Sequence, residues 1–105
     1  MEEYNVFYSD EAINDLRDIY TYIAFDLKEP ITAAKLTERI RDKVRSIGLF
    51  PKKNRLVDFE SMRSLGMRQM PIDNFLVFYL TDDEKKKVSV VRILYGKRNI
   101  NELFE

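Results

Sequence analysis

Phe75-Leu-Val-Phe-Tyr-Leu80 and Val88-Ser-Val-Val-Arg-Ile-Leu-Tyr95 are the two stretches of sequence that decide the fold of this chain. Both are rich in aromatic, aliphatic and β-branched residues, which favour strands over helices. The segment between them, Asp82 to Lys87, consists of charged residues throughout, as expected of a solvated turn. Together they predict a β-hairpin whose second strand ends just before Gly96.

Upstream of the hairpin, the sequence predicts a strand followed by a first helix. Tyr4–Tyr8 has the composition of a short strand, and Ser9 follows as a helix N-cap with acidic residues in the first turn. Steps of three and four residues then define an apolar helical stripe. The stripe comprises Ile13, Leu16, Ile19, Tyr20, Ile23 and Leu27.

Pro30 ends this helix and opens a second one at its first turn. The second apolar stripe comprises Ala33, Leu36, Ile40, Val44 and Ile47. Gly48 ends the helix as a C-cap. Residues 49–66 are predicted to be irregular. Met67–Ile72 could be a further strand, in which Pro71 requires either an edge position or the end of the strand.

The predicted order is therefore β-α-α-β-β-β over one domain, residues 1–105. We expect an α+β fold in which a small, antiparallel-rich sheet packs against an N-terminal α-hairpin. The chain has no segment that indicates a repeat or a linker.

The composition excludes several classes of chemistry. Among 105 residues there is no cysteine and no histidine. A Ser-His-Asp triad, thiol catalysis and metal sites built on Cys or His are thus impossible. No apolar run approaches the roughly 20 residues that cross a bilayer, and the N-terminus lacks the pattern of a signal peptide, so we expect a cytoplasmic protein without membrane contact.

Charge is unevenly distributed along the chain, although its net value is zero. Residues 1–30 hold eight acids and two bases, a net −6, and residues 31–105 hold ten acids and sixteen bases, a net +6. The strand that ends at Tyr95 feeds the turn Gly96-Lys97-Arg98-Asn99. The Lys97 ammonium is a mobile point charge, and the planar Arg98 guanidinium can bind an anion through two N–H groups at once. This turn could therefore hold a phosphate.

The whole pattern resembles the RelE/ParE superfamily of bacterial toxins from type II toxin–antitoxin modules. The resemblance covers nearly the whole chain and rests on short motifs in a fixed order. These are Tyr4 to Tyr8, Ser9-Asp-Glu-Ala-Ile-Asn-Asp-Leu16, Tyr22-Ile23, Pro30, Ile47-Gly-Leu-Phe-Pro51, Arg68, Phe75 to Tyr79, and Ile93-Leu-Tyr-Gly-Lys-Arg-Asn99.

The resemblance implies a toxin that causes growth arrest, contributes to plasmid stabilisation and is neutralised in a hetero-oligomer with its cognate antitoxin. RelE-like members cut mRNA on the ribosome, ParE-like members poison DNA gyrase, and neither activity uses a metal or cofactor. Narrowly, we expect a ribosome-dependent mRNA endonuclease. The alternatives are a gyrase inhibitor without chemistry of its own and an inactive, antitoxin-binding homologue.

RNA cleavage needs a base for the ribose 2′-hydroxyl, a cation for the developing phosphorane charge and an acid for the leaving oxygen. Arg98 matches the arginine of the family's Gly-Lys-Arg-type turn, which contacts the scissile phosphate in RelE-like enzymes. Arg68 lies near the basic residue of the family's second strand, and Lys97 adjoins Arg98. These three residues are the catalytic candidates.

Further residues are candidates for binding the substrate. Lys52, Lys53 and Arg55 would contact a nucleic-acid backbone, or they form a solvated loop. Arg92 would extend the phosphate surface, or it forms a cross-strand ion pair. Phe104 stands near the family's base-stacking tyrosine.

Two positions differ from the family motifs, and one set of acidic residues is explained by helix geometry without a functional role. Leu76 stands near the place of a further RelE-type arginine, and Tyr95 replaces a ParE-type histidine. The acids of the first helix are spaced for a solvent-facing helix surface. These acids are Asp10, Glu11, Asp15 and Asp18.

Overall fold

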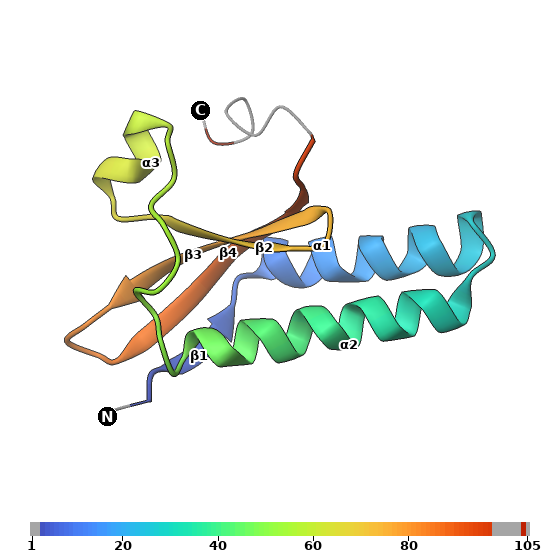
Figure 1. The fold of residues 1–105 in the computed structure, drawn as a ribbon, viewed down its shortest axis with the longest axis horizontal. Coiled ribbons are helices and arrows are strands. Elements are labelled where there is room, and N and C mark those ends of the chain that lie inside the picture. The colour runs from blue at the N-terminus through green and yellow to red at the C-terminus, as the bar shows by residue number, and fades with distance from the viewer. Residues whose placement is uncertain (1–2, 98–103, 105) are drawn as a thin grey trace.

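A computed structural model describes residues 3–97 and residue 104, and shows helices and strands in the predicted order with one additional short helix (Figure 1). The elements are β1 (Asn5–Tyr8), α1 (Asp10–Thr21), the π-helical turn η1 (Tyr22–Asp26), α2 (Pro30–Ile47), α3 (Glu60–Ser64), β2 (Arg68–Ile72), β3 (Phe75–Asp82) and β4 (Lys87–Tyr95). The four strands form one sheet in the order β1-β4-β3-β2. β1 runs parallel to β4, and the other neighbours are antiparallel. The predicted α+β class and antiparallel-rich sheet are confirmed.

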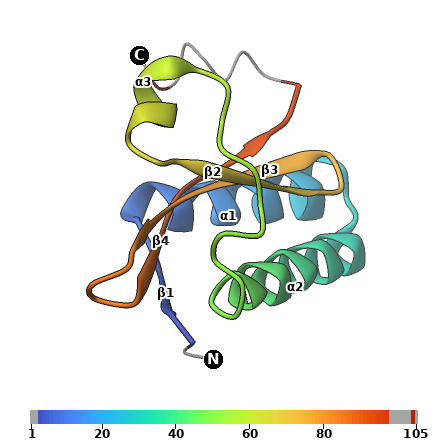
Figure 2. The ribbon, with the colours of Figure 1, turned by 60° about the vertical axis from the view of Figure 1, so that its left-hand side comes forward.

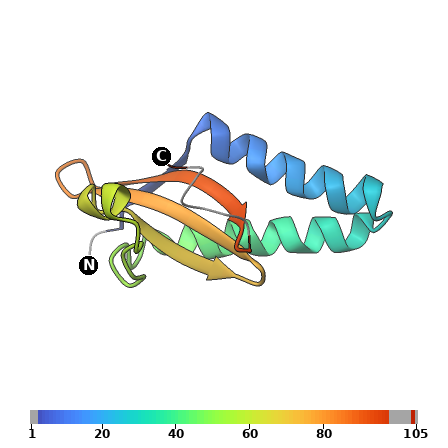
Figure 3. The same ribbon diagram turned by 90° about the horizontal axis from the view of Figure 1, so that it is seen from above.

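The sheet separates two apolar cores, because side chains alternate between its faces. Val77 and Tyr79 of β3 join the core under α1 and α2, whereas Phe78 joins a smaller core under α3 and the loop before it. Figures 2 and 3 show the α1–α2 hairpin along one face of the sheet and the α3 segment at the other. No helix in residues 3–97 is long and apolar enough to cross a membrane.

Ser9 joins β1, α1 and β4, as its predicted capping role requires. Its Oγ accepts a hydrogen bond from the Ala12 N–H at 3.0 Å and donates one to the Val91 carbonyl at 2.7 Å. Its own N–H donates to the Val90 carbonyl at 2.9 Å. One side chain thus fixes both the start of the helix and its position beside the hairpin strand.

Gly48 is the C-cap of α2, as predicted, but the reason for glycine differs from the prediction. Its φ is −60°, so it does not use the left-handed conformation typical of C-terminal glycines. A Cβ at this position would lie 2.5 Å from the Tyr4 carbonyl oxygen, and the Tyr4 N–H donates to the Gly48 carbonyl at 2.8 Å. Close contact with the N-terminal strand is therefore what requires a glycine.

Residues 49–66 were predicted to be irregular, and this is wrong for the turn of helix at α3. Five residues are too few to show a helical period in the sequence. Gly66, with a φ of 82°, ends the helix, and the Met67 N–H donates to the Met62 carbonyl at 3.1 Å. This left-handed cap returns the chain into β2.

β2 is an edge strand, which confirms the prediction from Pro71. The start of this edge is covered, since the Gln69 N–H donates to the Arg55 carbonyl and the Val57 N–H to the Met67 carbonyl, both at 3.0 Å. Farther along, Pro71 has no N–H to offer.

The apolar stripe of the first helix is only partly buried. Leu16 is 8% exposed, but Ile13 is 45%, Tyr20 37% and Leu27 52% exposed. At the far end of the hairpin, η1 and the start of α2 extend past the end of the sheet, so the sheet does not cover Leu27 (Figure 3). The far end of the hairpin therefore presents apolar side chains that the chain itself leaves uncovered.

Candidate functional site

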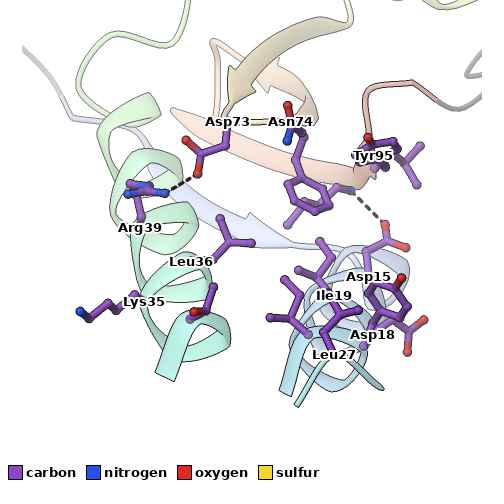
Figure 4. A pocket seen from close by; sticks show the side chains of 16 residues that line it. Asp15, Asp18, Ile19, Leu27, Lys35, Leu36, Arg39, Asp73, Asn74 and Tyr95 are labelled. Carbon is purple, nitrogen blue, oxygen red and sulfur yellow. Dashed lines mark hydrogen bonds and ion pairs between the residues drawn. The ribbon is translucent and has the colours of Figure 1, made fainter. Parts of the chain in front are cut away.

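A cleft of about 1270 Å³ opens where the hairpin extends past the sheet (Figure 4). Its walls come from α1 with η1, from α2, and from the β2–β3 turn with the end of β4. The lining residues are Asp15, Asp18, Ile19, Tyr22, Ile23, Leu27, Thr32, Lys35, Leu36, Arg39, Asp73, Asn74, Phe75, Ile93, Leu94 and Tyr95. Most of the lining surface is apolar, so the cleft suits a hydrophobic partner.

Two ion pairs tie the hairpin to the sheet at the borders of this cleft. On one side, Arg39 of α2 pairs with Asp73 of the β2–β3 turn. On the other, the Asp15 carboxylate of α1 accepts hydrogen bonds from Arg92 Nε at 2.7 Å, Arg92 Nη2 at 2.8 Å and the Ile93 N–H at 2.9 Å. These hydrogen bonds raise the pKa of Arg92, against the opposing effect of its burial. Asp15 thus binds both the Arg92 side chain and the backbone of β4, at a point where β1 no longer pairs with that strand.

The rim of the cleft carries two charges of opposite sign. Asp18 projects from α1 and Lys35 from α2, on opposite sides of the opening (Figure 4). Neither forms an ion pair with another residue in the described part of the chain. Both are therefore available to a charged partner.

Exposed apolar residues continue from the cleft over the tip of the hairpin. Tyr22 and Leu27 line the cleft and are more than half exposed. Phe25 of η1 and Ile31 of α2 do not line the cleft, and they are 68% and 71% exposed. Large apolar side chains gathered in this way mark an interaction surface.

Arg68 lies at the start of β2, where it holds the preceding loop. Its Nη1 donates to the Asn54 carbonyl at 2.7 Å. Beside it, the buried Tyr79 hydroxyl donates to the Pro51 carbonyl at 2.9 Å and accepts from Asn54 Nδ2 at 3.2 Å. Burial raises the pKa of Tyr79, and the hydrogen bond from Asn54 opposes this effect. The chemistry visible around Arg68 is thus that of a loop anchor.

The structure does not bring Arg68 and Lys97 together. Across β3, Arg68 is aligned with Val90 in the middle of β4, whereas Lys97 follows Tyr95, the last residue of that strand. Five residues of strand span roughly 17 Å at about 3.4 Å per residue. Arg98, the leading catalytic candidate, lies outside the described residues. Its role stays a prediction.

Most candidates for substrate binding have partners within the protein. Lys52 pairs with Asp83 at 2.7 Å and Arg55 with Asp58 at 3.2 Å. Lys53 is exposed and forms no ion pair with the residues described. For Arg92, the ion-pair alternative is the one observed, with its partner on α1 in place of a neighbouring strand.

Phe104 packs into the smaller core. Its ring stacks on Phe59 with centroids 5.5 Å apart and meets the edge of Phe78 at 5.2 Å. In this position the ring covers the face of the sheet opposite the hairpin. A role in base stacking would require it to leave that contact.

The sequence offered little to identify Asp15. The helix pattern predicts a solvent-facing surface for Asp15 together with Asp10, Glu11 and Asp18, but the Asp15 side chain is only 12% exposed. Its partners on β4 lie 77 and 78 residues away, a separation that no local pattern reveals. The position of Asp15 one residue before the buried Leu16 was the only signal.

Comparison with known proteins agrees with this architecture. The sequence model of the family described as "ParE toxin of type II toxin-antitoxin system, parDE" matches residues 6–100. A chain of the chromosomal ParDE toxin–antitoxin system of P. aeruginosa has 18% identity and a TM-score of 0.74, over 90% of this chain and 98% of that one. No curated protein sequence matches the chain.

Two further solved structures share the fold. A mutant of the E. coli toxin RelE in the free state has 15% identity and a TM-score of 0.66, over 97% of this chain and 90% of that one. A chain of the Mycobacterium tuberculosis RelBE2 complex has 17% identity and a TM-score of 0.63, over 89% and 98%. The family match spans nearly the full sequence, and the chain therefore belongs to the ParE toxin family of type II toxin–antitoxin systems, within the RelE/ParE superfamily.

Proposed function

We propose that this toxin acts by binding DNA gyrase and not by cleaving mRNA. The observation that carries the proposal is the separation of Arg68 from Lys97 along the sheet. A nuclease must place its cations and its proton acceptor around one phosphate. An inhibitor that acts by binding has no such requirement, and the family match favours the ParE branch.

The environments of the other cations support the same choice. Arg92 is neutralised by Asp15, and the Arg68 guanidinium donates to the Asn54 carbonyl. This reverses the narrow preference for an endonuclease, which becomes the alternative outcome of the test.

The cleft and the hairpin tip are the surface that we assign to the cognate antitoxin. An amphipathic helix binds an apolar groove of this kind by placing its apolar face in the groove. With Asp18 on one rim and Lys35 on the other, such a helix would carry a basic residue toward α1 and an acidic residue toward α2. The resulting complex is a toxin–antitoxin hetero-oligomer.

The test of the activity is a supercoiling assay with purified gyrase, beside a ribosome-dependent translation assay with the mRNA ends mapped. We expect the chain to stop supercoiling and to leave the mRNA uncut. Arg68→Ala should retain inhibition in proportion to its folded fraction, because Arg68 is a loop anchor. Normal supercoiling together with cut mRNA would overturn the proposal.

The test of the antitoxin surface is a charge reversal at the cleft rim. Lys35→Glu should weaken antitoxin binding by about tenfold, since a rim pair becomes a repulsion. Lys43→Glu is the matched control, because it makes the same change on the same helix away from the cleft. Equal antitoxin affinity for both variants would show that the antitoxin binds another surface. It would not bear on the gyrase proposal.

A further inference from the structure

A second groove, of about 520 Å³, lies between α1 and α2 on a different side of the hairpin from the cleft. Its lining residues are Tyr8, Ile13, Leu16, Arg17, Tyr20 and Arg41. Positions 13, 16, 17 and 20 follow one face of α1, whereas the cleft uses positions 15, 18, 19 and 22. Helix α1 therefore serves two separate grooves.

The floor of the second groove is apolar and accessible. Leu16 closes its base at 8% exposed, while Ile13 and Tyr20 remain 45% and 37% exposed. Tyr8 adds an aromatic ring from β1, and burial raises the pKa of its hydroxyl. These residues form a continuous seat for one or two apolar side chains.

The charges at this groove are positive and poorly matched within the protein. Arg17 donates to Asn14 Oδ1 at 3.3 Å and has no carboxylate partner among the described residues. Arg41 reaches Glu38 only at 3.9 Å. Among the residues that the structure describes, no acidic side chain lines the groove, in contrast to the cleft, where α1 contributes Asp15 and Asp18.

We propose that this groove binds a short acidic amphipathic segment of another protein. One or two apolar side chains would sit on Leu16 and Tyr20, and flanking carboxylates would pair with Arg17 and Arg41. Arginine suits such a site, because its fork grips a carboxylate in two places and its stem covers apolar surface. The proposal depends neither on gyrase inhibition nor on antitoxin binding in the cleft, since it uses a different face of α1.

The test is fluorescence polarisation with a labelled helical peptide of roughly 12–15 residues that carries leucines on one face and glutamates beside them. A second peptide has lysine in place of every glutamate. We expect the acidic peptide to bind and the basic one not to bind. Arg17→Glu and Arg41→Glu should each lower the affinity for the acidic peptide by about fivefold. Lys43→Glu, also on α2, should leave that affinity unchanged.

The decisive variant is the double exchange of Arg17 and Arg41 for glutamate. It should reverse the preference, so that the basic peptide binds and the acidic peptide does not. Circular dichroism shows whether the variant is folded, and both arginines are exposed, so folding should survive. Equal binding of the acidic peptide to the wild type and the double variant would overturn the proposal. So would a dimer in sedimentation velocity that the double variant dissociates, because a second copy would then be the occupant.

Discussion

Removal of the Asp15 charge by Asp15→Asn should cost this small domain a large share of its stability. The carboxylate accepts three N–H groups from Arg92 and Ile93, at distances of 2.7, 2.8 and 2.9 Å. Breaking one partner of a buried pair costs about 3–5 kcal/mol, and the 24% exposure of Arg92 reduces this to about 2–3 kcal/mol. We expect a fall of roughly 10–20 °C in Tm, and a matching loss in the free energy of unfolding by urea.

Asp73→Asn is the matched control for this prediction. Asp73 also pairs with an arginine, Arg39, between hairpin and sheet, but the side chains are 43% and 56% exposed. Its φ of 52° is one that asparagine adopts readily, so the turn is preserved. We expect a loss of at most about 1 kcal/mol. If the two variants unfold at the same urea concentration, the Asp15–Arg92 pair does not stabilise the packing of hairpin on sheet more than the Asp73–Arg39 pair does, and the reasoning is wrong.

Three further predictions concern the packing around the sheet. Gly48→Ala should lower the free energy of unfolding by about 1–3 kcal/mol in urea, because a Cβ would lie 2.5 Å from the Tyr4 carbonyl oxygen. Tyr79→Phe should cost about 1–2 kcal/mol at neutral pH. The pKa of Tyr79 is raised above 10.0 in the folded protein. The hydroxyl therefore contributes its full stabilisation below that value and loses it as the pH rises through the raised pKa. Urea titrations should show the difference in free energy of unfolding between wild type and Tyr79→Phe shrinking at alkaline pH. Phe104→Ala should lower Tm by several degrees through the lost stacking on Phe59, and an unchanged Tm would show that the contact contributes nothing.

The elements of the fold could be predicted because their signals are local. The N-cap at Ser9, the opening of α2 at Pro30 and the edge position of Pro71 each depend on the chemistry of one residue and its immediate neighbours. The hairpin of β3 and β4 follows from two apolar runs around a charged turn. The helix α3 was missed because five residues carry no period.

The site was harder to predict because it depends on register and on long-range contacts. The sequence predicts Arg68 on a strand and Lys97 on the turn after another strand, but only the strand pairing shows that Arg68 is level with Val90, five residues before the end of β4. Likewise, an acidic residue on an amphipathic helix looks solvent-facing until the structure pairs Asp15 with Arg92. The length of the hairpin relative to the sheet, which creates the cleft, is also visible only in three dimensions (Figure 3).

Primer extension on cellular mRNA shortly after induced expression shows directly whether the toxin acts by binding and leaves RNA intact. We expect growth arrest with no new 5′ ends, and the same mRNA pattern for an Arg98→Ala control. New 5′ ends in phase with codons that disappear in Arg98→Ala would contradict this expectation and establish an mRNA endonuclease with Arg98 in its site.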